Sequence, residues 1–277
     1  MRLATIRLGG STAAVRADSD TAATLIPGFA DLSGLLAEPK WRTIAAAADG
    51  AQVDLATAEY APVVPSPGKI ICVGLNYASH IIEMGREIPQ YPTLFAKFKE
   101  ALTGPYDDVH VPGYAAAELD WEAELAVIIG APAFRVSAAE AEDRIAGYSI
   151  LNDYTMRDFQ YRTPQWDQGK TFEKTSGFGP FLDTEFQLGG TIETRLDGEV
   201  MQSASTDDLV FGPAALIEYI SHIVSLQPGD VIATGTPSGV GHARSPKRYI
   251  GHGQTVAVRI DGLGTLCNTT LIGPEGR

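Results

Sequence analysis

The stretch DWEAELAVIIG, residues 120–130, carries two acidic residues in a segment that otherwise has the apolar composition of a buried strand. Side chains two positions apart point to the same face of a strand, so Glu122 and Glu124 face one side while Ala123 and Leu125 face the other. Two carboxylates in one low-dielectric place repel each other and resist desolvation. A strand of this kind needs a shared proton, basic partners or a bound cation. The alternative is a strand end at which both acids reach water.

The composition favours an enzyme-sized soluble protein that acts on a small molecule. The chain has 277 residues, 44% of them hydrophobic and 20% charged, which suits one large domain or one with a small appendage. No apolar run approaches the ~20 residues of a membrane span, and the N-terminus lacks a continuous apolar signal core, so we expect a cytoplasmic protein. A net charge of −13 offers no basic field for nucleic acid or an anionic membrane.

A proline-rich run divides the chain. The sequence APVVPSPGK cannot hold a helix and is typical of a connector. We therefore expect a small N-terminal module over residues 1–65 and a larger domain over residues 66–277. The module is predicted to open with two strands around Gly9-Gly10 and to contain a helix near residues 41–48.

Strand patterns dominate the larger domain. The runs TLFAKF, ELAVIIG and GYSILND predict strands, and two further segments predict hairpins that turn at Asp-Gly pairs, residues 197–198 and 261–262. Helices are fewer: one follows the capping-box pair Ser137 and Glu140, and one begins at Pro213. The order of elements lacks the regular βαβ alternation of a Rossmann or barrel enzyme, so the predicted fold class is α+β and sheet-rich.

Three further features can serve chemistry. Asp153 ends the run GYSILND and is a candidate third oxygen ligand for a hard divalent cation, although a turn-forming role explains it equally well. His80 and Glu83 lie one helical turn apart, where the acid can orient the imidazole; the alternative is an exposed histidine. The loop ATGTPSGVG can bring backbone N–H groups close to an anion, and Thr236 can donate its hydroxyl to a carboxylate; alternatively it is a plain turn.

An ordered series of motifs resembles the fumarylacetoacetate hydrolase family over roughly residues 68–273. The motifs are CVGLNYASHIIEMG, YPTLFAKF, DWEAELAVIIG, YSILNDYTMRDFQ, GKTF and GDVIATGTPSGVG. The resemblance implies a mixed β-sandwich roll as the catalytic domain, a small α/β module before it, and a homodimer. It also implies a Mg²⁺ or Mn²⁺ ion, replaceable by Ca²⁺ in crystals, on the acids that match Glu122, Glu124 and Asp153.

The same resemblance implies roles for other side chains. His80 and Glu83 would lie on a mobile segment that closes over the substrate and activates water, with Gly74 and Gly85 as hinge positions. Lys170 of GKTF, rather than the nearby Lys174, would stabilise a developing enolate.

The substrate would have its own contacts. The resemblance implies that Arg157 and Gln160 contact the substrate carboxylate or the lid. Thr236 is the third predicted substrate contact. The alternative for Arg157 is an ion pair with Asp158 or another acid.

We predict hydrolysis of a C–C bond in an acylpyruvate or a related β-diketo acid, a keto acid of aromatic catabolism, to give pyruvate and a carboxylate. Oxaloacetate decarboxylation and keto–enol or double-bond isomerisation of a hydroxymuconate-type diacid are the alternatives, because all three share one enolate. A non-catalytic binding protein of the same fold is the remaining alternative. No role is expected for the other histidines: His222 is predicted to be packed or capped on its helix, and His110, His242 and His252 to be exposed.

Overall fold

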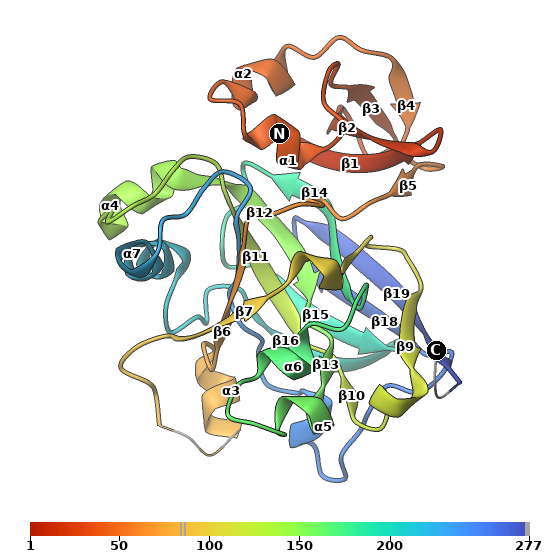
Figure 1. Ribbon diagram of the computed structural model, residues 1–277, viewed down its shortest axis with the longest axis vertical. Coiled ribbons are helices and arrows are strands. Elements are labelled where there is room, and N and C mark those ends of the chain that lie inside the picture. The colour runs from red at the N-terminus through yellow and green to blue at the C-terminus, as the bar shows by residue number, and fades with distance from the viewer. Residues whose placement is uncertain (84, 86, 275–277) are drawn as a thin grey trace.

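Strands account for most of the regular structure, as the sequence patterns predict (Figure 1). The computed structural model describes residues 1–83, 85 and 87–274. In spatial order, the largest sheet consists of β4 (Gln52–Asp54), β3 (Ala22–Leu25), β2 (Ser11–Ala17), β1 (Arg2–Leu8), β14 (Ser176–Asp183), β12 (Ile145–Asn152), β11 (Ala123–Ile129), β17 (Val231–Ala233), β6 (Ile70–Gly74) and β7 (Thr93–Lys97). In addition, β5 (Glu59–Tyr60) pairs with β1, and β8 (Leu102–Thr103) pairs with β14.

A second sheet packs against this one and contains both predicted hairpins. Its order is β16 (Glu199–Ser205), β15 (Thr191–Leu196), β18 (Thr255–Ile260), β19 (Gly264–Gly273) and β9 (Val109–Pro112). A short pair joins β10 (Leu119–Asp120) to β13 (Thr155–Met156). The α+β, sheet-rich fold class is therefore confirmed.

Short helices surround the sheets. They are α1 (Leu32–Leu36), α2 (Trp41–Ala46), α3 (Ala78–Glu83), α4 (Ala138–Ala141), α5 (Arg157–Gln160), α6 (Asp167–Lys170) and α7 (Pro213–Ile223). The capping box at Ser137 forms as predicted, but α4 soon ends in a single 3₁₀ turn because Ile145 already pairs with Ile129 of β11. None of the helices in the described part of the chain has both the length and the apolar composition needed to cross a bilayer.

Residues 1–65 form the upper part of the molecule in Figure 1, with α1 and α2 beside their strands. Their sheet is continuous with the rest, because Arg2 and Leu3 of β1 pair with Asp183 and Leu182 of β14. Arg7 of β1 also forms a two-pronged ion pair with Asp107, with N–O distances of 2.8 and 2.7 Å. The division at residue 65 stays a prediction.

Strand β11 lies at the centre of the fold and is buried along its whole length. It shares apolar contacts with three groups of elements: Ile128 with the side bearing α1 and α2, Leu125 with the second sheet, and Val127 with α7. Its first residues lie beside the end of β12 and near the end of β17, which runs parallel to β6. The loops that follow β6, β12 and β17 therefore meet at the start of β11.

Two isoleucines of α7 test how much the packing of this helix stabilises the fold. Ile220 is fully buried among residues of β6, β11 and β17, whereas Ile223 in the same helix is 64% exposed. We expect Ile220→Ala to lower the free energy of unfolding by about 2–5 kcal/mol, and Ile223→Ala to change it by about 0.5 kcal/mol or less. Denaturant unfolding measures both, and equal effects would contradict this packing.

The Arg7–Asp107 pair predicts a pH dependence of stability. Burial opposes the charge of Asp107, but hydrogen bonds from Arg7 and the Gly104 amide outweigh it, so the pKa of Asp107 is lowered. A lowered carboxyl pKa contributes stability above the unfolded value of about 3.9, and this contribution is lost as the pH falls through the folded value. Asp107→Asn should therefore destabilise the protein at pH 7 by an amount that shrinks below about pH 4. Asp108→Asn, on an exposed neighbour, is the control. Denaturant unfolding at several pH values gives the free energy of unfolding of each protein. If Asp107→Asn stays as destabilised in acid as at pH 7, the lowered pKa of Asp107 is not the cause.

Candidate active site

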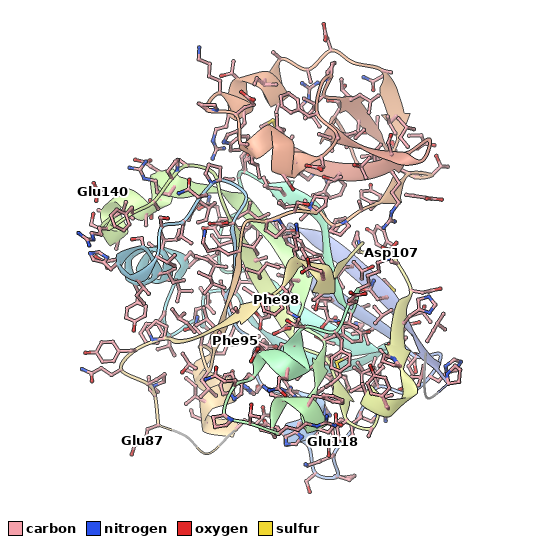
Figure 2. The ribbon with its side chains drawn as sticks, viewed as in Figure 1. Glu87, Phe95, Phe98, Asp107, Glu118 and Glu140 are labelled. Atoms are coloured by element: carbon pink, nitrogen blue, oxygen red, sulfur yellow. The ribbon has the colours of Figure 1, made fainter. Side chains whose placement is uncertain are left out.

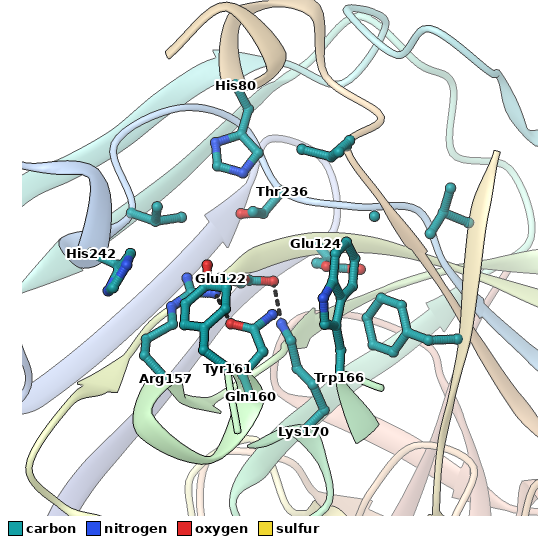
Figure 3. A pocket seen from close by; sticks show the side chains of 15 residues that line it. His80, Glu122, Glu124, Arg157, Gln160, Tyr161, Trp166, Lys170, Thr236 and His242 are labelled. Atoms are coloured by element: carbon teal, nitrogen blue, oxygen red, sulfur yellow. Dashed lines mark hydrogen bonds and ion pairs between the residues drawn. The ribbon is translucent and has the colours of Figure 1, made fainter. Parts of the chain in front are cut away.

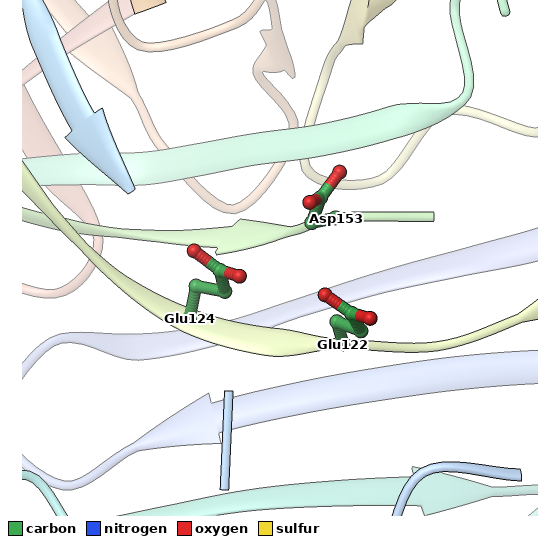
Figure 4. Close-up of side chains that lie close together, drawn as sticks. All are labelled: Glu122, Glu124 and Asp153. Atoms are coloured by element: carbon green, nitrogen blue, oxygen red, sulfur yellow. The ribbon is translucent and has the colours of Figure 1, made fainter. Parts of the chain in front are cut away.

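Three buried carboxylates meet where β11 begins and β12 ends (Figure 4). Ligand atoms of Glu122, Glu124 and Asp153 all lie within 4.8 Å of one another. The strand alternation turns Glu122 and Glu124 to one face, and the Asp153 amide donates to the Glu122 carbonyl at 2.9 Å. The three acids predicted as metal ligands thus come together.

Cationic side chains from three other segments surround these acids. Lys170 Nζ donates to Glu122 Oε2 at 2.6 Å and to Asp153 Oδ2 at 2.8 Å. Lys97 Nζ lies 2.8 Å from Asp153 Oδ1, and Arg157 Nη1 lies 2.7 Å from Glu122 Oε1. Burial alone would discharge Lys170, but Asp153 and Glu122 outweigh it and raise the pKa of the ammonium group above its usual value. Burial likewise opposes the charge of Glu122, yet Lys170 and Arg157 lower its pKa.

Glu124 differs from its two neighbours. Its carboxylate accepts a hydrogen bond from the Gly235 amide at 2.9 Å, and no cationic side chain within the described residues forms an ion pair with it. Burial, followed by repulsion from Asp153 and Glu122, raises the pKa of Glu124 well above its usual value. Asp153 Oδ1 is also buried, and its contact within the described chain is the ion pair with Lys97 Nζ at 2.8 Å.

This donor set fits a hard divalent cation. Such ions bind several carboxylate oxygens, and an ion here would compete with the proton that the raised pKa favours on Glu124. The cluster holds neither cysteine nor histidine, and an all-oxygen set of this kind disfavours zinc and copper.

A glycine contact positions Lys170. A Cβ atom on Gly169 would lie 2.5 Å from the Gln160 nitrogen and 2.6 Å from the Met156 carbonyl, so α6 packs closely on α5 only because residue 169 is glycine. Lys170 follows directly and points inward, whereas Lys174 is exposed. The GK pattern therefore marks the lysine that reaches the acids.

His80 and Glu83 lie on α3 as one pair. His80 Nδ1 is 3.0 Å from Glu83 Oε2, and the Glu83 carboxylate also accepts the Gly239 amide at 3.0 and 3.2 Å. In the neutral ring, Nδ1–H donates to Glu83, so Nε2 keeps its lone pair. Figure 3 shows the ring above the cavity, on the side opposite Lys170 and Gln160.

A cavity of about 60 Å³ lies among these side chains (Figure 3). Because about 10–15 Å³ of such space is the minimum for one water molecule and a water in the liquid takes about 30 Å³, the cavity has room for a few waters. The predicted site residues that line it are His80, Glu122, Glu124, Arg157, Gln160, Lys170 and Thr236. Asp153 is fully buried beside Glu122 and Glu124, and Glu83 contacts His80.

Arg157 is occupied by acids. Its Nε donates to Asp120 Oδ2 at 2.8 Å and its Nη1 contacts Glu122, so the alternative of an ion pair with an acid holds, although the partner is not Asp158. Gln160 Oε1 accepts a hydrogen bond from Arg157 at 3.0 Å, which leaves the amide nitrogen of Gln160 for the cavity.

Thr236 lies in the tight loop after β17. Gly235 has φ +96°, and a Cβ there would lie 2.7 Å from the Val73 carbonyl, so this loop needs glycine to press against β6. Thr236 Oγ1 accepts a hydrogen bond from Gln202 at 2.8 Å, which leaves its own proton for a ligand.

Several residues near the cavity were not predicted. They are Lys97, Asp120 and the cavity-lining Phe95, Tyr161, Trp166 and His242. Lys97 had a usable signal, because a lysine interrupts the strand run TLFAKF in the way that the acids interrupt β11. Phe95 lies on the predicted strand β7 (Figure 2), whereas Tyr161 and Trp166 lie in irregular segments whose placement the local sequence does not determine.

One expectation is wrong and two need a different reading. His242 is half-buried at the cavity rather than exposed. His222 is exposed rather than packed, but its Nδ1 lies 2.8 Å from the Glu218 carbonyl, so the capped alternative holds. A Cβ on Gly74 would lie 2.3 Å from the Trp166 ring, so close packing explains this glycine without a hinge.

Comparison with known proteins identifies the family of this chain. Residues 69–271 match the family described as fumarylacetoacetate hydrolase, C-terminal. Oxaloacetate tautomerase YisK of Bacillus subtilis is 42% identical over 216 residues, which cover 76% of this chain and 71% of the relative. Human mitochondrial oxaloacetate tautomerase FAHD2A is 40% identical over 75% of this chain and 68% of its own length.

Solved structures agree with this result. Fumarylacetoacetate hydrolase of Exiguobacterium antarcticum has a TM-score of 0.88 and 30% identity, over 99% of this chain and 100% of that one. A 5-carboxymethyl-2-hydroxymuconate delta-isomerase from Mycobacterium smegmatis has a TM-score of 0.81 and 32% identity over both whole chains. Because the family match spans most of the chain and these relatives share its fold, this protein belongs to the fumarylacetoacetate hydrolase family.

Proposed function

We propose that this protein is a metal-dependent tautomerase that interconverts the keto and enol forms of a small 2-oxo diacid such as oxaloacetate. One observation carries the proposal: the Nε2 lone pair of His80 faces a small cavity opposite a group of buried carboxylates and ammonium groups. That arrangement puts a base on one side of a substrate and a site for its oxygen atoms on the other. Relatives about 40% identical to this chain are named oxaloacetate tautomerases, which supports the same assignment.

Mg²⁺ or Mn²⁺ would be held by Glu122, Glu124 and Asp153 and would polarise the keto oxygen of the substrate. The Lys170 ammonium, which contacts two of these acids, adds positive charge where the enolate oxygen develops. The Gln160 amide and the Thr236 hydroxyl supply neutral donors for the substrate carboxylate.

His80 would move the proton. Nε2 takes a proton from the carbon next to the keto group, and the Glu83 carboxylate stabilises the imidazolium that forms. The ring then returns that proton to the enolate oxygen, so one C–H bond breaks, one O–H bond forms and nothing else is consumed. The reverse sequence converts the enol to the keto acid.

Hydrolysis of an acylpyruvate is the second candidate. The cavity holds a few water molecules next to His80, and the pair with Glu83 could remove a proton from water as readily as from carbon. The small cavity favours the four-carbon diacid over longer acyl chains.

A comparison of substrates tests the function. We expect the Mg²⁺-loaded protein to accelerate the loss of enol absorbance from freshly dissolved oxaloacetate, above the rate with Mg²⁺ and buffer alone. Pyruvate release from acetylpyruvate and oxaloacetate, followed in parallel, should be slower. His80→Gln should reduce the tautomerase kcat by about 10²–10⁴-fold, because it removes the base. Rapid pyruvate release from acetylpyruvate without enol consumption would instead favour the hydrolase.

Metal binding depends most strongly on Glu124. We expect Glu124→Gln to weaken Mn²⁺ binding at least tenfold, because the variant removes the carboxylate that has no ion-pair partner among the described residues. Glu173→Gln, on an exposed acid three residues beyond Lys170, is the matched control. Isothermal titration calorimetry of the metal-free protein gives both constants, and unchanged binding in Glu124→Gln would remove this residue from the metal site.

A further inference from the structure

His242 lies on the opposite side of the cavity from Glu124. Figure 3 shows Glu124 and Trp166 on one side, His242 on the other, and Glu122 between them. A substrate that presents its 2-oxo acid end to Glu124 and Lys170 would therefore extend toward His242. The proposed function leaves this end of the cavity without a role.

The His242 side chain is fixed from several directions. Its backbone amide donates to the buried Asp120 carboxylate at 3.0 Å, and its ring packs against Tyr161 with 5.1 Å between ring centroids. Its Nδ1 lies 3.0 Å from the Tyr249 hydroxyl and 3.5 Å from Lys247 Nζ. A ring held in this way is already positioned to receive a ligand, so little entropy is lost when it binds one.

These contacts favour a ring proton on Nε2. The Lys247 ammonium has no lone pair and can only donate, and the Tyr249 hydroxyl can donate as well, so Nδ1 can act as the acceptor of both contacts. Burial, followed by the charges of Lys247 and Arg157, lowers the pKa of His242 and so favours the neutral ring. The remaining N–H donor is therefore available on the cavity side.

The surrounding loop is basic in an acidic protein. The chain has a formal charge of −13, yet the sequence HARSPKR of residues 242–248 contains no acid. Arg244 is turned to the carbonyls of Gly239 and Met201, whereas Lys247 and Arg248 are exposed. The carboxylates of Glu118 and Asp120 also lie near His242, but their effect on its pKa is smaller than that of Lys247 and Arg157. The remaining positive charge at this end of the cavity would attract an anionic group.

We propose that His242, supported by Lys247, binds the second carboxylate of a 2-oxo diacid and so selects diacids over 2-oxo monoacids. This inference rests on the proposed function for the orientation of the substrate. The Nε2–H of His242 donates a hydrogen bond to the distal carboxylate. The Lys247 ammonium strengthens this contact in two ways: it polarises the imidazole ring through Nδ1, and it attracts the carboxylate directly by its charge. The same contact cannot form with a substrate whose distal group is apolar.

Two unreactive ligands test the inference separately from catalysis. L-malate and L-lactate share the 2-hydroxy acid end, and only malate carries a second carboxylate. Calorimetry with the Mg²⁺-loaded protein should show tighter binding of malate than of lactate. His242→Leu should weaken malate binding about tenfold or more, the loss expected for one charge-assisted hydrogen bond, and leave lactate binding unchanged. His242→Gln, which retains an N–H donor, should recover most of the malate affinity.

The controls distinguish the possible outcomes. His110→Leu, on an exposed histidine of β9 that does not line the cavity, should bind both ligands like the original protein. An equal loss for malate and lactate in His242→Leu, or no preference for malate in the original protein, would overturn the inference. If enol-oxaloacetate is not turned over but the malate preference depends on His242, the proposed reaction fails and the diacid subsite stands.

Discussion

The burial of acidic charge on β11 is the constraint on which the rest of the site depends. A carboxylate in a low-dielectric interior is strongly disfavoured unless cations or hydrogen-bond donors compensate it. Lys97 on β7, Arg157 on α5 and Lys170 on α6 supply that compensation to Glu122 and Asp153. Lys170 contacts both acids, so its loss would leave Glu122 with Arg157 alone and Asp153 with Lys97 alone.

Glycine contacts make this convergence possible. Gly74 accepts the Trp166 ring, Gly169 lets α6 approach α5, and Gly235 lets the loop after β17 press on β6. Each is a position at which a Cβ atom would push apart two segments that hold site residues. Glu83 adds a further link, because its carboxylate joins α3 to the Gly239 amide as well as to His80. The Glu83 carboxylate therefore fixes the position of the His80 ring and of the loop that contains Gly239 at the same time.

Proteins similar to this chain are named for several different reactions. Their names include oxaloacetate tautomerases, a hydroxymuconate isomerase and a fumarylacetoacetate hydrolase. An enolate is a common chemical basis for such reactions, so the carboxylates and the base alone do not distinguish among them. Side chains at the far end of the cavity can. The relatives also include both a bacterial protein and a mitochondrial one, so family membership leaves the compartment open.

The sequence determined the sheet-rich fold, the two hairpins, the pairing of His80 with Glu83, and the three acids that come together. These features follow from local rules: strand alternation, Asp-Gly turns and the spacing of one helical turn. Ordered motifs then identified the family. Only the tertiary structure decided that Arg157 contacts Asp120 and Glu122, that Lys97 reaches Asp153, and that His242 faces the cavity. Such contacts join segments separated by many residues, and the packing of the whole chain, rather than any local pattern, brings them within reach.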